Sequence, residues 1–267
     1  MKTKVKKITS EQNPFFKKLL KLRDSRGIKK LEMALLAGEK NVREVVNEFP
    51  GQCLGLITFS LDALKPFLSK IDLPVYLMPR GLFQRLDFHN TKNPILIIKA
   101  RPLCQWTDKK IEKGCVVFLP FQDPANLGAA IRASAAFGVN TVVVLEEAAH
   151  PFHPKSLRAS GSSIFRVQLK RGPSIRELAL RQLPLLVLDP KGKDISCYEF
   201  PDSFALVAGL EGPGVPEELK KAESLAIPIR QGVDSLNAAM AVGIALYQWR
   251  ISQQRKRIGN KTRHCGV

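Results

Sequence analysis

The chain has 267 residues, of which 42 are Lys or Arg and 24 are Asp or Glu, so its formal net charge is +18. This length allows one large or two ordinary domains, and a hydrophobic content of 45% is that of a folded protein. The longest apolar runs are too short for a membrane span, the basic N-terminus lacks the apolar core of a signal peptide, and five scattered cysteines fit neither a disulfide framework nor a zinc site. We therefore expect a cytoplasmic protein with a polyanionic partner, nucleic acid being favoured over a membrane surface.

The first predicted helix begins at Pro14, with Asn13 as its N-cap, and is expected to end at Gly27. Its apolar residues recur at helical spacing, and its other face is basic. We interpret the basic face as one that contacts phosphates, with a merely solvated face as the alternative. The candidate nucleic-acid-binding residues are Lys17, Lys18, Lys21, Arg23, Arg26, Lys29 and Lys30.

A small α/β unit is predicted for residues 1–100. Its further elements are a helix over 39–48, strands over 54–59, 75–78 and 95–100, and a helical segment over 62–68. Residues 101–113, with a proline and several charges, are expected to form a linker. The net charge is +12 up to Lys113 and +6 beyond it, so the basic excess is concentrated in the first part.

The second part, residues 114–258, alternates strongly apolar strands with helices, which predicts a mostly parallel sheet covered on both faces. The expected strands are 115–119, 141–145, 165–167, 185–188, 204–208 and 225–229, and the expected helices are 127–137, 156–159, 174–182, 217–221 and 235–254. Residues 259–267 are expected to be a short, basic and mobile tail.

Three stretches that could carry catalytic or binding residues follow strands of this second part, where open α/β sheets place their ligands. They are FQDPANLGAAIRAS with Asn126 and Arg132, VAGLEGPGVP with Glu211 among glycines, and IPIRQGVDSLNAA. In the third, Ser235 is expected to open a helix, whose free N–H groups would suit a polar ligand. On geometry alone, an ordinary strand-loop-helix with Ser235 as its cap is the alternative.

Together, these stretches resemble the SpoU (TrmH-type) branch of the SPOUT RNA methyltransferases, whose motifs run approximately N-x-G-x-x-x-R, G-N-E-G-x-G and I-P-x…S-L-N. The matching residues are Asn126, Gly128 and Arg132; Gly209, Glu211, Gly212 and Gly214; Ile227, Pro228, Ser235, Leu236 and Asn237. The resemblance covers about residues 114–249. More loosely, NPFFKKLLKL resembles the opening helix of the family's ribosomal-protein-like substrate-binding domain. Ala125, Leu210 and Ala238-Ala239 stand where the family usually has Gly, Asn and Val-Ser.

The resemblance implies an α/β fold with a deep trefoil knot, a homodimer, and transfer of a methyl group from S-adenosylmethionine to a ribose 2′-hydroxyl of structured RNA. It implies a cofactor site at Gly209, Leu210, Gly212, Ile227, Ile229 and Leu236, and catalytic roles for Arg132, Asn126, Glu211, Ser235 and Asn237. Ribosomal RNA is favoured over tRNA by family analogy alone. An RNA-binding protein without catalysis is one alternative. A Rossmann-type enzyme is another, but the sequence lacks the G-x-G-x-x-G that it needs. No catalytic metal is expected, because the sequence has no His/Cys cluster.

Overall fold

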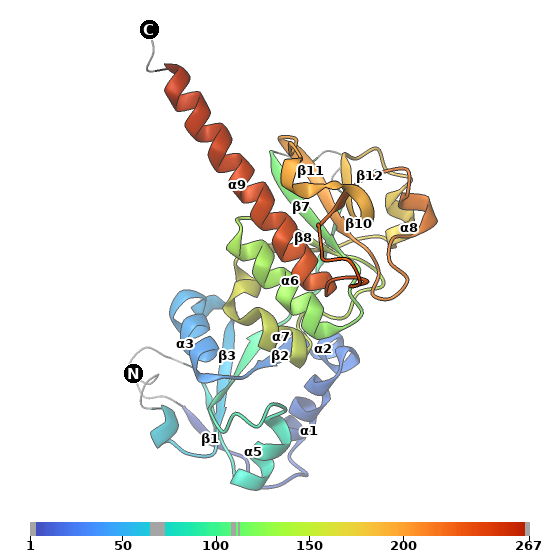
Figure 1. Cartoon of the computed structure of the whole chain (residues 1–267). Coiled ribbons are helices and arrows are strands. Elements are labelled where there is room, and N and C mark those ends of the chain that lie inside the picture. The colour runs from blue at the N-terminus through green and yellow to red at the C-terminus, as the bar shows by residue number, and fades with distance from the viewer. Residues whose placement is uncertain (1–3, 65–72, 108–110, 112, 265–267) are drawn as a thin grey trace. The chain divides into compact units, whose positions relative to one another are not determined.

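The computed structural model describes residues 4–64, 73–107, 111 and 113–264 (Figure 1). It divides into two compact units, Met1–Pro102 with His150–Phe165, and Leu103–Ala149 with Arg166–Val267. This division corrects the expected domains, 1–100, 101–113 and 114–258, in two places. The segment 150–165 belongs to the first unit, and the second unit already begins within the expected linker.

The first unit is built on a five-stranded mixed sheet of order β1-β4-β3-β5-β2. Its strands are β1 (Val5–Lys7), β2 (Met33–Leu36), β3 (Cys53–Thr58), β4 (Val75–Leu77) and β5 (Ile95–Lys99). β1 and β3 run parallel to β4, whereas β5 runs antiparallel to β3 and β2. Neighbouring residues of a strand point to opposite faces, and both sets are buried in β2, β3 and β5, so both faces of the sheet are covered.

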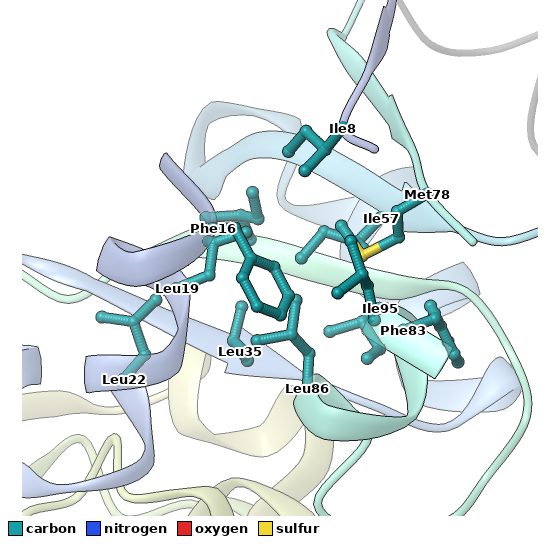
Figure 2. Close-up of a cluster of buried hydrophobic side chains, with 12 residues drawn as sticks. Ile8, Phe16, Leu19, Leu22, Leu35, Ile57, Met78, Phe83, Leu86 and Ile95 are labelled. Carbon is teal, nitrogen blue, oxygen red and sulfur yellow. The ribbon is translucent and has the colours of Figure 1, made fainter. Parts of the chain in front are cut away.

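Short helices provide this cover. They are α1 (Pro14–Leu20), α2 (Ser25–Leu31), α3 (Glu39–Glu48), α5 (Arg80–Leu86) and α7 (Pro154–Ser160), with 3-10 turns η1 (Lys21–Arg23), η2 (Pro50–Gln52), η3 (Asp62–Leu64) and η4 (Gly161–Phe165). Figure 2 shows Phe16 of α1 and Leu86 of α5 directed at strand residues of one buried cluster, among them Leu35 and Ile57. α7 contacts β2, and η4 contacts α3, so the segment 150–165 completes the first unit.

The expected long basic helix is broken into α1, η1 and α2. Asn13 caps α1 as predicted, its side chain accepting hydrogen bonds from the N–H groups of Phe15 and Phe16. Asp24 then takes an extended conformation, and its carboxylate accepts from the N–H of Gly27 at 2.8 Å, which starts α2. Gly27 therefore lies inside a helix and does not end one. A Cβ there would approach the backbone oxygen of Lys21 to 1.8 Å, so this tight junction requires glycine.

The structure confirms some of the other elements predicted for the first unit and contains others that were not predicted. The helix over 39–48 and the three strands are confirmed to within two residues. The segment 62–68 is described only as the 3-10 turn η3, and the rest of it lies outside the described residues. β1, β2 and α5 were not expected.

The second unit contains a seven-stranded sheet of order β12-β10-β11-β7-β8-β9-β6, and all of its pairs are parallel, as predicted. The strands are β6 (Cys104–Gln105), β7 (Gly114–Leu119), β8 (Thr141–Val144), β9 (Gln168–Arg171), β10 (Leu185–Asp194), β11 (Ser203–Ala208) and β12 (Glu223–Ala226). The strand expected over 165–167 is wrong. Phe165 ends η4 and packs against Phe49 of the first unit at a ring distance of 5.4 Å, and the strand begins three residues later.

Two sets of elements cover the faces of this sheet. They are α6 (Pro124–Ala136) and α9 (Ala238–His264), which lie side by side in Figure 1, and α8 (Ile175–Leu178) with the 3-10 turn η6 (Glu217–Leu219). A further 3-10 turn, η5 (Ile195–Cys197), follows β10. The helices expected over 174–182 and 217–221 are thus much shorter than predicted. Within the described residues, none of the helices is both long and apolar enough to cross a membrane.

From Leu103 onward, the expected linker is part of the second unit. β6 pairs with β9, and Trp106 is only 3% exposed, with its ring edge-to-face against Phe118 at 4.9 Å. A large aromatic residue fills core volume that would otherwise be empty, which a flexible connection does not need. At the other end, α9 continues to His264, so most of the expected tail 259–267 is helical.

Candidate active site

A cavity of about 490 Å³ opens in the second unit where four neighbouring strands, β12, β10, β11 and β7, end. Parallel strands bring their carboxyl ends to one edge, so loops distant in sequence meet there. The lining includes nine of the residues expected at the site, namely Asn126, Gly209, Leu210, Glu211, Gly212, Ile227, Ile229, Ser235 and Leu236.

The loop after β11 turns back on itself at the cavity. Leu210 and Gly214 exchange two backbone hydrogen bonds of 2.8 and 3.0 Å, which close a tight turn. Gly212 and Gly214 have φ angles of +89° and +74°, a region that favours glycine. At Gly209, a Cβ would lie 2.9 Å from the carbonyl carbon of Gly214. The glycines of this motif therefore let two backbone segments approach closely beside the cavity.

A chain of hydrogen bonds joins all three motifs. The Glu211 carboxylate accepts from the backbone N–H groups of Gln122 and Asp123, each at 2.8 Å, and from the side-chain amide of Asn126. The Asn126 side-chain oxygen accepts from the Asn237 amide at 2.9 Å. Three donors thus converge on one carboxylate, which fixes the loop after β7 against the loop after β11.

The third motif differs from its expected conformation. α9 begins at Ala238, not at Ser235, and the Asn237 side-chain oxygen accepts from the N–H of Met240 at 3.1 Å. Asn237 therefore has the capping role that the sequence suggested for Ser235. Ser235 is exposed in the loop before the helix and lines the cavity instead. The expectation of free helical N–H groups at Ser235 is wrong.

The structure does not bring Arg132 to the cavity of its own chain. Arg132 is exposed on α6, is not among the lining residues, and forms no hydrogen bond or ion pair with another residue that the structure describes. It follows Asn126 by six positions, which turns it about 240° around the helix axis. Arg132 is therefore not positioned beside this cavity within the single chain.

Sequence reasoning missed one part of the lining, namely Leu188, Asp189 and Pro190. β10 pairs with β12 on both sides of an irregularity between Leu188 and Lys193, and the intervening loop bulges at the cavity. The Asp189 carboxylate accepts from the N–H of Lys191 at 2.8 Å, which stabilises the bulge. The sequence DPKG, a turn signal at the end of an apolar strand, could have revealed it.

The lining has acidic and uncharged groups but no basic side chain. Its polar side chains are Asn126, Asp189, Glu211 and Ser235, and the remaining lining residues are apolar or glycine. Such a cavity favours a ligand with hydroxyl or cationic groups and an apolar body. Among the described residues, no group of His, Cys, Asp and Glu side chains could hold a metal ion.

The seven candidate RNA-binding residues all lie in the first unit. They are exposed and distributed over α1, η1 and α2: Lys17, Lys18, Lys21, Arg23, Arg26, Lys29 and Lys30. We call them the basic face. Because the predicted helix is broken, these residues do not form a single stripe along one helix axis.

Known proteins similar to this chain are RNA-modifying enzymes. The chain is 43% identical over 260 residues to "Ribosomal RNA small subunit methyltransferase G 2" of Syntrophobacter fumaroxidans, but it spans only 51% of that relative, about half of its length. It is 28% identical over 263 residues to the 23S rRNA (guanosine(2553)-2′-O)-methyltransferase RlmP of Bacillus subtilis, which covers 92% of this chain and all of that one (100%).

The fold also has known counterparts. The crystal structure of an AdoMet-bound rRNA methyltransferase from Sinorhizobium meliloti matches with a TM-score of 0.76 at 22% identity, over 92% of this chain and 97% of that one. At this identity the likeness shows a shared fold. The model of the SpoU rRNA Methylase family matches residues 114–247, half of the chain, and includes all three motifs. The chain therefore belongs to the SpoU rRNA methylase family.

Proposed function

We propose that this protein transfers a methyl group from S-adenosylmethionine to a ribose 2′-hydroxyl of structured RNA, most favourably ribosomal RNA. The observation that carries the proposal is the hydrogen-bonded chain Glu211–Asn126–Asn237 beside the cavity, because it joins the three family motifs into one site. The B. subtilis relative is by name a 2′-O-methyltransferase of 23S rRNA, which supports the substrate class. A ribosomal substrate would place the enzyme in the cytoplasm.

The cavity fits the proposed cofactor. Gly209 lets the backbone of Gly214 and Val215 pack directly against it at the cavity edge, and Ile227, Ile229 and Leu236 provide apolar surface for the adenosine. Backbone groups of Leu210 and Gly212 complete this side. When bound, S-adenosylmethionine supplies an electrophilic methyl group on a positively charged sulfur. The acidic lining suits that charge. The trefoil knot of the family is expected to form this side of the cavity.

The chain's own polar groups divide the remaining tasks. Glu211 receives three donors, so we assign it the positioning of the two loops, and not the removal of a proton. Asn126 and Asn237 hold each other at 2.9 Å beside the cavity and would orient the ribose. Ser235 is exposed, and its hydroxyl has no partner among the described residues, so it is placed to take or relay the hydroxyl proton.

A homodimer would complete the site. Seven large hydrophobic side chains are exposed in the described chain, and four of these lie within or just before α9, namely Ile229, Val233, Met240 and Tyr247. Such clustering on one segment is typical of an interface. Arg132 is exposed on the neighbouring helix α6, and in a dimer it would reach the partner's cavity as a phosphate-binding cation next to the reacting ribose.

A complementation experiment tests the shared site. Arg132→Ala and Gly209→Val chains are each expected to lose activity, for different reasons. If the arginine acts across the dimer, a heterodimer contains one complete site. Equal, randomly mixed chains should then recover about a quarter of wild-type activity, as expected for two-fold symmetric pairing. Arg132→Lys should not replace arginine, because lysine lacks the planar fork. Failure to recover activity, together with a monomeric mass by sedimentation, would exclude the dimeric site.

The RNA target is identified by mapping ribose methylation in ribosomal RNA and tRNA from cells with and without the gene, followed by methylation of the same RNA by the purified protein. A single 2′-O-methyl group lost from ribosomal RNA is the expected result. Loss of a 2′-O-methyl group from tRNA instead would identify tRNA as the substrate. RNA binding without any methyl transfer in the presence of S-adenosylmethionine would indicate a binding protein of the same fold.

A further inference from the structure

A loop of the first unit holds two arginine side chains at adjacent positions. The loop, residues 87–93, connects α5 to β5. The guanidinium of Arg23 lies over the ring of Phe88, with its central carbon 5.6 Å from the ring centroid. Nη1 of Arg158 lies 3.4 Å from Nδ1 of His89, the next residue of the loop. Side chains from η1 and α7, far apart in sequence, thus contact adjacent residues of one loop.

The two contacts of His89 together fit one tautomer of its ring. Its Nε2 lies 3.1 Å from the backbone oxygen of Pro154, and a carbonyl oxygen can only accept, so Nε2 carries the hydrogen. Its Nδ1 faces the guanidinium of Arg158, which can only donate, so Nδ1 has a free lone pair. A neutral His89 therefore accepts one N–H of Arg158 and leaves the other guanidinium donors unused.

The loop itself is held in one conformation. Asp87 is 7% exposed, and its carboxylate accepts from the hydroxyl of Thr91 at 3.1 Å and from the N–H of Lys92 at 2.7 Å. Asn90 and Lys92 have φ angles of +50° and +57°, which residues with a side chain adopt rarely. A loop fixed in this way keeps Phe88 and His89, and with them both arginines, in a defined arrangement.

Neither arginine is neutralised by a carboxylate. Both are exposed, and neither forms an ion pair with another residue that the structure describes. The nearest carboxylate in sequence, that of Asp24, accepts from the N–H of Gly27 and caps α2. The flanking exposed side chains of Lys21 and Arg26 add positive charge.

We propose that Arg23 and Arg158 form a paired binding site for phosphate groups of the RNA backbone. This inference rests on the proposed function, since it assumes an RNA substrate. A guanidinium matches a phosphate in a bidentate manner, and a pre-oriented side chain loses less entropy on binding. Arg23 covers the ring of Phe88, so base stacking there is disfavoured and the contact is independent of RNA sequence.

The test measures binding of a fluorescein-labelled stem-loop RNA to the full-length protein by anisotropy at several salt concentrations. Arg158→Ala and Arg23→Ala should each weaken binding about three- to tenfold at about 0.1 M salt and lower the salt slope by about 1. The matched control is Lys155→Ala, which removes the same charge from the same helix at an exposed position without the His89 contact. Its effect should be below about twofold. Arg158→Lys should behave like Arg158→Ala.

His89 acts as a positioning residue, and a double-mutant cycle detects this. His89→Ala should weaken RNA binding about threefold in the wild-type background and have no further effect in the Arg158→Ala background, because the oriented group is already absent. In the Lys155→Ala background, the effect of His89→Ala on the free energy of RNA binding should add to the effect of Lys155→Ala. An equal effect of His89→Ala on RNA binding in the wild-type and Arg158→Ala backgrounds would show that the imidazole does not act through Arg158.

Several outcomes would overturn the paired site. Equal weakening by Arg158→Ala and Lys155→Ala would indicate only a diffuse positive field. If Arg158→Ala binds RNA with the affinity of the wild-type protein and still methylates it, the paired site is refuted but the proposed function stands. Absence of RNA binding by the wild-type protein would refute both the paired site and the proposed function. If polyglutamate binding depends on both arginines more strongly than RNA binding does, the site is for an acidic polypeptide. Unchanged thermal unfolding and unchanged S-adenosylhomocysteine affinity verify that each variant is folded.

Discussion

In the second unit, the polar side chains beside the cavity hydrogen-bond to one another, whereas in the first unit the basic face points to solvent from three short helices. Glu211, Asn126 and Asn237 have defined partners at hydrogen-bond distance. The cavity should therefore be sensitive to single substitutions and insensitive to salt. The basic face should show the opposite behaviour, because a field of exposed charges is screened by ions and each charge contributes little.

The largest effect is expected for Glu211→Ala. This change removes the acceptor of two backbone N–H groups and of the Asn126 amide, and hydrogen bonds to a charged group contribute about 1.5–3 kcal/mol each. We expect turnover to fall at least about 100-fold, which corresponds to roughly 2.7 kcal/mol. Glu217→Ala is the control, since that carboxylate is exposed and bonds to the Lys220 ammonium nearby. Comparable turnover of both variants would contradict the positioning role of Glu211.

The next effect is expected for Gly209→Ala. Its Cβ would lie 2.9–3.2 Å from backbone atoms of Gly214 and Val215, which cannot move aside as a flexible side chain would. Overpacking of this kind costs about 1–3 kcal/mol, so S-adenosylhomocysteine should bind roughly tenfold more weakly or worse by calorimetry. Gly243→Ala in α9 is the matched control, because its Cβ would meet Ala133 at an ordinary 3.8 Å. Equal affinities of the two variants would show that close backbone approach at Gly209 is not needed.

A smaller effect is expected for Asp189, the lining residue that sequence reasoning missed. One of its oxygens accepts from the N–H of Lys191, and the other is available to a hydroxyl or cationic group of the cofactor. Asp189→Ala should weaken S-adenosylhomocysteine binding about three- to tenfold, the effect of one hydrogen bond of about 1 kcal/mol. Asp189→Asn retains the turn and tests the charge separately. Unchanged binding by both variants would limit Asp189 to stabilising the bulge.

On the basic face, a single lysine should matter little. Lys18→Ala is expected to weaken RNA binding only about two- to threefold and to lower the salt slope by about 1, because one exposed charge contributes to a summed field. The measurement is anisotropy with a labelled stem-loop RNA at several salt concentrations. A loss of more than about tenfold from this one lysine would show that the basic face is as locally specific as the cavity.

The smallest effect concerns the pH dependence of stability. Burial first, and then the charge of Lys155, lower the pKa of His153 below its usual 6.5, partly offset by Asp24. The unfolded chain therefore takes up this proton first, so the stability contributed by neutral His153 is present above pH 6.5 and is lost as the pH falls toward the lower folded pKa. Neutral Nδ1 also accepts from the N–H of Lys155, which caps α7.

The corresponding measurement is thermal unfolding of the wild type and of His153→Gln between pH 5 and about 8. The wild-type Tm should decline below pH 6.5 by a few degrees more than that of the variant, at most about 4 °C. Parallel curves would mean that His153 titrates alike in the folded and unfolded chain.

The sequence alone determined the features that depend on local geometry. Asn13 and Pro14 predicted the start of α1. The Asn13 side chain accepts from N–H groups of the first turn, and Pro14 lacks an N–H at a position where that group would have no helical partner. The apolar strands of the second unit predicted a parallel sheet. The position of the three motifs at strand ends predicted that they meet at one edge of the sheet, because the carboxyl ends of parallel strands share that edge. The family resemblance supplied most of the residues that line the cavity.

Tertiary structure decided where segments pack. The residues 150–165 follow a strand of the second unit in sequence but belong to the first unit, and Trp106 of the expected linker fills a core. Arg132 does not line the cavity of its own chain. The physical reason is common to these cases. Periodicity and capping report contacts within a few residues, whereas the surface that buries a segment is set by partners distant in the chain, which no local pattern encodes.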